Sequence, residues 1–129
     1  MIEAVCLCGG VRIEVASAPE QVTSCNCGAC LRLGTLWAYY TVDQVRITGE
    51  TVGYARHDIP GQDEPMLAFH HCPTCGCATH WASLNDRPRM GVNARLMPPQ
   101  ILAAAPVKRL DGARTWDEIE DLDWRITFT

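Results

Sequence analysis

The sequence has almost no lysine and no excess of positive charge. Eleven of its 129 residues are Lys or Arg and 15 are Asp or Glu, so the formal net charge is −4, and Lys108 is the only lysine. Nucleic-acid-binding domains usually carry a basic patch, so nucleic acid is a poor candidate partner. The planar fork of arginine suits carboxylates and phosphates, which is a weak indication of an anionic ligand, although compositional bias of the source genome is the simpler explanation.

The sequence also lacks a long apolar run. No stretch approaches the roughly 18 apolar residues of a membrane span, and the start, MIEAVCLCGG, lacks the regions of a signal peptide. We therefore expect a cytoplasmic protein with no membrane partner. Thiol pools keep cysteines reduced in that compartment, so the eight cysteines indicate metal ligands or reactive thiols, with a secreted disulfide scaffold as the alternative.

Internal repeats and low-complexity tracts are missing too, and the length and the 47% of hydrophobic residues fit a single domain over residues 1–129. Residues 11–15 alternate apolar and charged side chains, as in a half-buried strand. Six further short apolar runs are bounded by Gly, Pro, Asn or Asp: residues 35–42, 44–50, 51–57, 65–71, 78–84 and 89–96. Such runs predict a mostly β domain with an antiparallel sheet.

Little helix is expected. One turn of helix is predicted around Gly28 and another over residues 114–122, where Thr115 is a potential cap. Residues 97–114 are predicted to be a long irregular connection. Three apolar side chains after it are expected to dock onto the sheet: Trp116, Leu122 and Trp124.

Two of the cysteine motifs match in chemistry. CLCGG near the start and CPTCG later each place two cysteines close together and a glycine after the second, where a positive φ costs little. In an extended segment residues i and i+2 project to the same face, so one ion can take both sulfurs of the first motif. The two half-sites together predict a structural four-sulfur zinc site that ties the first strand to a late one. Its ligands would be Cys6, Cys8, Cys72 and Cys75.

The third motif, CNCGAC, is different. Cys25, Cys27 and Cys30 come from one tight segment, and Leu31 rather than glycine follows the last of them. So short a segment cannot easily enclose a metal, and three protein ligands with one open position are typical of catalytic zinc. The open position would suit a substrate thiolate, a soft donor that zinc accepts.

Other interpretations of this motif remain open. A closed site could be completed by Cys77, His71 or His80, or the three thiols could be a redox cluster without metal. Cys77 itself is expected to be a small buried hydrophobe. Alternation along a strand sends His70 and His71 to opposite faces, and His57 and His80 have no spacing argument.

The ordered motifs CLCGGVRIEV, CNCGAC, CPTCG and VNARL, together with PVKRLDGARTWDEI, resemble the glutathione-dependent formaldehyde-activating enzyme family, whose relatives include centromere protein V. The resemblance implies a small antiparallel β-tent fold with one structural zinc and a second zinc held by three cysteines. It assigns Cys6, Cys8, Cys72 and Cys75 to the first metal and Cys25, Cys27 and Cys30 to the catalytic one. Asn26 stands where the family usually has histidine.

The resemblance further implies a carbon–sulfur lyase that forms or cleaves S-hydroxymethylglutathione, in which zinc presents a thiolate to an aldehyde carbon. Glutathione carries carboxylates, so Arg32, Arg56 and Arg95 are candidate anchors. Asn93 and Arg95 rank first because NARL recurs in the family pattern. The partner expected is a small-molecule thiol.

Two other functions fit the same motifs. A carrier would bind glutathione or another thiol at the open zinc without converting it. A zinc-stabilised protein-interaction domain, as in guanine-nucleotide-exchange chaperones of related tent fold, would be indifferent to glutathione and to the loss of Cys27.

Overall fold

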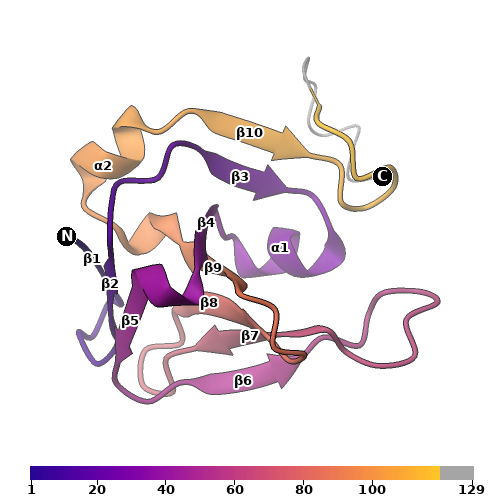
Figure 1. Cartoon of the computed structure of the whole chain (residues 1–129), viewed down its shortest axis with the longest axis horizontal. Helices are drawn as coiled ribbons and strands as arrows, with labels where there is room; N and C mark the ends of the chain where they lie inside the picture. The colour runs from indigo at the N-terminus through magenta and orange to yellow at the C-terminus, as the bar shows by residue number, and fades with distance from the viewer. Residues whose placement is uncertain (120–129) are drawn as a thin grey trace.

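The computed structural model describes residues 1–119 and consists mainly of two β-sheets (Figure 1). The first has three antiparallel strands in the order β1-β2-β5. The second has seven in the order β10-β3-β4-β9-β8-β7-β6. The strand bounds are β1 Ile2–Val5, β2 Arg12–Val15, β3 Val22–Cys25, β4 Trp37–Thr41, β5 Val45–Thr48, β6 Val52–Ala55, β7 Leu67–His71, β8 Ala78–Ser83, β9 Arg89–Asn93 and β10 Val107–Leu110.

This architecture confirms the mostly β prediction and the predicted strands. One strand pair departs from the expected antiparallel arrangement: β10 runs parallel to β3, with Val107 opposite Val22 and Leu110 opposite Cys25. The two pairing partners are far apart in the sequence, so the local pattern carries no signal for this pair. Its consequence is that β10 and the turn after it lie beside the CNCGAC segment.

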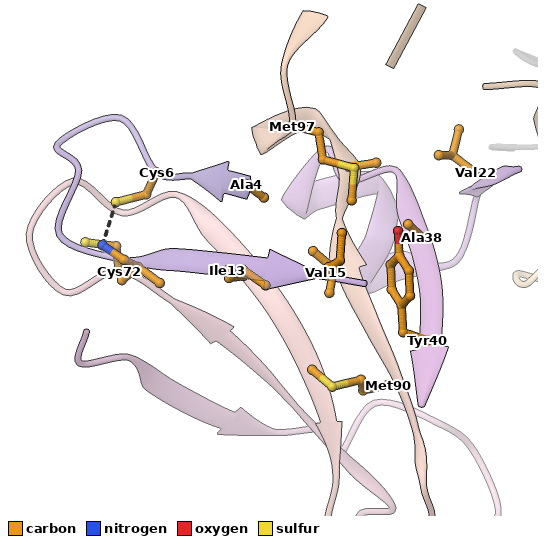
Figure 2. Close-up of a cluster of buried hydrophobic side chains, with 13 residues drawn as sticks. Ala4, Cys6, Ile13, Val15, Val22, Ala38, Tyr40, Cys72, Met90 and Met97 are labelled. Carbon is orange, nitrogen blue, oxygen red and sulfur yellow. Dashed lines mark hydrogen bonds between the residues drawn. The ribbon is translucent and has the colours of Figure 1, made fainter. Parts of the chain in front are cut away.

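The main core packs the small sheet against the large one (Figure 2). Ile13 and Val15 of β2 are fully buried, as their alternation with charged residues predicts. They share this cluster with Ala38 of β4 and Val92 of β9, which come from the other sheet. Figure 2 places Cys6 and Cys72 at one end of the same cluster, so a metal ligated there would close the end of the core.

The helices are short. The two α-helices, α1 (Gly28–Leu33) and α2 (Pro99–Ala104), have six residues each, and η1 (Val42–Gln44) and η2 (Ala94–Leu96) are 3₁₀ turns. Among the described residues no helix has the length and apolar character needed to cross a bilayer. In Figure 1, α1 lies between the β3/β10 side of the molecule and the β6/β7 side.

Two predictions about the C-terminal third were wrong. Residues 97–114 are not an irregular connection, because they contain α2, which begins after Pro98, and the edge strand β10. The expected helix from residue 114 is absent from the described part of that range: Trp116 has φ 63°, which a helix does not allow, and Glu118 bridges back to Leu110. The Trp116 side chain is 53% exposed, and the predicted docking of Leu122 and Trp124 lies outside the described residues.

Candidate metal centres

The structure brings Cys6, Cys8, Cys72 and Cys75 together, with their sulfur atoms all within 4.8 Å of one another. The Cys6 and Cys8 sulfurs are 3.6 Å apart, and so are those of Cys8 and Cys72. Zinc–sulfur bonds of about 2.3 Å in a tetrahedron place sulfurs roughly 3.8 Å apart. The donor set therefore fits a closed tetrahedral zinc site.

Both half-sites are tight turns. Residues after β1 form a turn rather than the expected extended segment, since the Gly9 amide donates to the Cys6 carbonyl at 3.0 Å. The Gly76 amide donates to the Cys72 carbonyl in the same way. The glycines take φ of 79° and 80°, the positive φ that their place in the motifs predicts. Backbone amides of Cys77 and Cys8 lower the pKa of Cys75 to about 5, which favours the thiolate that a metal binds.

The second cluster gathers Cys25, Cys27 and Cys30, again with all sulfurs within 4.8 Å. Cys25 ends β3, Cys27 caps α1 and Cys30 lies in the first turn of that helix. A chain that leaves a strand and turns at once into a helix thus folds its three thiols onto one point. They are 8%, 2% and 6% exposed.

Hydrogen bonds fix these thiols. The Cys27 amide donates to the Cys25 sulfur at 3.4 Å and the Cys30 amide to the Cys27 sulfur at 3.3 Å. The indole Nε1 of buried Trp37 donates to the Cys30 sulfur at 3.2 Å. Donation from Cys25 and Cys30 holds the pKa of Cys27 well below that of a free thiol, while the same hydrogen bonds raise the pKa of the two donors. Negative charge in the cluster is therefore held at Cys27.

The cluster has three ligands and not four. Among residues 1–119, no further His, Cys, Asp or Glu places a ligand atom with the three sulfurs. The three-cysteine site is therefore not closed by Cys77, His71 or His80. All eight cysteines are free thiols, and the shortest separations recorded between their sulfurs, 3.6 Å, are far longer than the roughly 2 Å of a disulfide bond.

The histidines lie elsewhere. A bulge separates His70 from His71 in β7, and the ring of His70 stacks on that of His80 at 4.4 Å. Burial, and secondarily the neighbouring His70, lowers the pKa of His80 to about 4, so this ring is neutral at physiological pH. None of these rings belongs to either cysteine cluster.

A cavity of about 170 Å³ opens over the three cysteines. Its walls are mostly aromatic or aliphatic, and among residues 1–119 Arg56 is its one cationic wall residue. Beside the cysteines it is lined by Trp37, Tyr39, Arg56, Ile59, Leu67, Phe69, Trp81, Leu110 and Trp116. Trp81 fits because Gly91 lies opposite it on β9: a Cβ there would come within 2.1 Å of the indole nitrogen.

Arg56 places a buried cation beside the cluster. Its side chain is 8% exposed, and it donates through Nε and Nη2 to the two carboxylate oxygens of Asp58 at 2.7 and 3.2 Å. Its guanidinium lies 5.4 Å from the centre of the Phe69 ring. The Arg56 charge contributes to the lowered pKa of Cys27. Arg56 is thus held to balance negative charge at the cysteines.

The turn after β10 covers one side of the cluster. A Cβ on Gly112 would stand 2.3 Å from the Cys25 sulfur, so only glycine fits there without movement. Asn26 holds this turn: its Nδ2 donates to Asp111 at 3.0 Å, and its Oδ1 accepts from the Ala113 amide at 2.9 Å. Gly112 and the role of Asn26 in this turn were not predicted from the sequence, although a DG pair after a strand is a common turn signal.

The predicted substrate-binding residues Arg32, Asn93 and Arg95 do not line this cavity. Arg32 is exposed on α1 and donates to the Gly28 carbonyl at 3.0 Å. Buried Asn93 caps η2 by accepting from the Arg95 amide at 3.2 Å, and it donates to the Ala78 carbonyl at 2.8 Å. Their role in binding substrate stays a prediction, whereas Arg56, the remaining candidate anchor, is in the cavity.

Comparison with known proteins decides the family. A model of the glutathione-dependent formaldehyde-activating enzyme family matches residues 1–107, most of the chain and all of both clusters. The chain belongs to this family. Membership agrees with the resemblance seen in the cysteine motifs and connects the chain with glutathione-dependent formaldehyde chemistry.

The fold also has a counterpart among solved structures. The crystal structure of a Rhodobacter sphaeroides protein, a structural genomics target, is 25% identical and superposes with a TM-score of 0.63. The match covers 81% of this chain and 98% of that one. No curated protein matches the chain.

Proposed function

We propose that this family member is a zinc-dependent enzyme of the carbon–sulfur lyase type. It would form or cleave the S-hydroxymethyl adduct of a thiol, glutathione in the first instance, and an aldehyde such as formaldehyde. The observation that carries the proposal is the three-cysteine cluster at the floor of a cavity, without a fourth ligand among residues 1–119.

The donor set suits zinc, because three thiolates within 4.8 Å of one another satisfy three tetrahedral positions. When bound, zinc would favour deprotonation of a substrate thiol and leave that thiol one position to occupy. Cys25, Cys27 and Cys30 would hold the ion, and Trp37 would fix the Cys30 sulfur through its indole hydrogen bond.

The remaining residues act on the aldehyde. In the forward direction the substrate thiol releases its proton, a carbon–sulfur bond forms between the thiolate and the carbonyl carbon, and the C=O π pair moves to oxygen. That oxygen then takes up one proton, which balances the one released by the thiol. Arg56 and Tyr39, which both line the cavity, would offer an N–H and an O–H donor to the developing oxyanion. Burial raises the pKa of Tyr39, so its hydroxyl keeps its proton near neutral pH. The aromatic walls would keep bulk water from the reacting carbon.

The test compares Cys27→Ala with Cys77→Ala, which removes a cysteine outside both clusters. Exchange between free formaldehyde and its glutathione adduct is followed by NMR, with the spontaneous rate subtracted. We expect acceleration by the wild type and by Cys77→Ala, and none by Cys27→Ala.

The alternatives give other outcomes. Glutathione binding that needs Cys27 but brings no acceleration would indicate a thiol carrier. A protein that binds no glutathione, and whose behaviour does not change in Cys27→Ala, would be a zinc-stabilised interaction domain.

A further inference from the structure

A second cavity adjoins the one over the cysteines. It has a volume of about 230 Å³. Four side chains form walls of both cavities: Arg56, Ile59, Leu67 and Trp81. The two cavities are therefore neighbours, and a ligand with its sulfur at the cysteines would reach the second cavity by extending past these side chains.

The second cavity is cationic in a chain that is acidic as a whole. In the described part of the chain its charged lining residues are Arg56, Arg87 and Arg89, with no Asp or Glu among them, while the formal net charge of the chain is −4. Such local inversion of charge concentrates an anionic ligand at one place on the surface.

Arg87 and Arg89 are free to bind such a ligand. Arg89 begins β9, Arg87 lies two residues before it in the connection from β8, and both side chains line the second cavity. Within residues 1–119 neither forms an ion pair, whereas Arg56 is held by Asp58. The Arg89 guanidinium lies 4.1 Å from the centre of the Tyr39 ring, and Tyr39 is itself a wall of the cysteine cavity.

We propose that Arg87 and Arg89 are the residues of this protein that bind the carboxylates of its thiol substrate. The inference rests on the proposed function, because that function places the sulfur at Cys25, Cys27 and Cys30. The arginine fork matches a carboxylate with two parallel hydrogen bonds. The apolar walls, Ile59, Met66 and Leu67, suit the uncharged middle of such a ligand.

The experiment measures Kd by calorimetry for two probes, glutathione and glutathione dimethyl ester, which keeps the thiol but loses both carboxylate charges. The proteins are the metal-loaded wild type, Arg87→Gln/Arg89→Gln, and Arg46→Gln as a matched control on β5 of the other sheet. All three arginines are exposed, so the variants should fold, which circular dichroism and zinc content verify.

We expect the double variant to bind glutathione about tenfold more weakly and the ester as the wild type does. Arg46→Gln should match the wild type with both probes. Equal weakening of both probes, unchanged glutathione binding in the double variant, or a wild type that binds glutathione no better than the ester overturns the inference.

Rates separate this inference from the proposed function. Arginine-dependent glutathione binding without acceleration of adduct formation leaves the carboxylate site standing and refutes the lyase proposal. If all three proteins accelerate adduct formation with the same KM for glutathione and for its ester, the lyase proposal stands and the carboxylate site is refuted.

Discussion

Replacing Gly112 by alanine should damage the three-cysteine cluster while sparing the other. The added Cβ would stand 2.3 Å from the Cys25 sulfur, 3.2 Å from the Cys27 Cβ and 3.3 Å from the Trp116 ring. Since Cβ contacts under 3.0 Å essentially do not occur, either the turn or Cys25 must move by about 0.7 Å or more. Overpacking of this size costs about 1–3 kcal/mol.

The cost should appear as weaker metal binding at the second site, by roughly 5- to 150-fold. A chromophoric chelator that competes for the metal would report two binding steps, of which only the one that Cys27→Ala abolishes should change in Gly112→Ala. Ala113→Ser is the matched control, because the Ala113 side chain is exposed. A Gly112→Ala variant that holds both metals as the wild type does would show that this turn does not lie against Cys25.

Three further variants test other contacts. Trp37→Phe keeps the stacking on Phe69 but loses the indole hydrogen bond to Cys30; second-site metal affinity should fall by about 1–2 kcal/mol in the same competition assay, and unchanged affinity would contradict that role. The pKa of His80 is about 4 in the folded chain and 6.5 for an ordinary histidine. As the pH falls, the unfolded chain therefore takes up this proton before the folded chain does. The free energy of unfolding therefore falls by up to about 3 kcal/mol as the pH is lowered from 6.5 toward 4. Urea unfolding of metal-loaded His80→Gln should show a smaller fall in the free energy of unfolding over that pH range, and a fall identical to that of the wild type would refute this linkage. Cys77→Ser should keep both metals by elemental analysis, since Cys77 is in neither cluster, and loss of one would make it a ligand.

Local sequence patterns predicted much of the fold. The alternation at Ile13 and Val15 predicted β2, and the strand runs that follow it were correct, because burial on one face of a strand leaves a two-residue period. The division of seven cysteines into four and three was also predicted. Turn glycines at residues 9 and 76 mark the half-sites of the first cluster, whereas the second comes from one short segment.

Long-range packing was beyond such patterns. The parallel pairing of β10 with β3 and the closure of Gly112 over Cys25 both join segments more than 80 residues apart. The helix expected from residue 114 failed because the turn there is held by Asn26, a contact that helix propensity does not record. Arg56 was one of several candidate arginines, and only its pairing with Asp58 beside the cavity distinguishes it.

The most direct measurement is the zinc content per chain of the purified wild type, Cys27→Ala and Cys77→Ala. We expect two zinc ions in the wild type and in Cys77→Ala, and one in Cys27→Ala, with its fold intact because Cys6, Cys8, Cys72 and Cys75 are untouched. One zinc ion in all three proteins would mean that Cys25, Cys27 and Cys30 are a thiol cluster without metal, and would contradict the zinc-dependent mechanism.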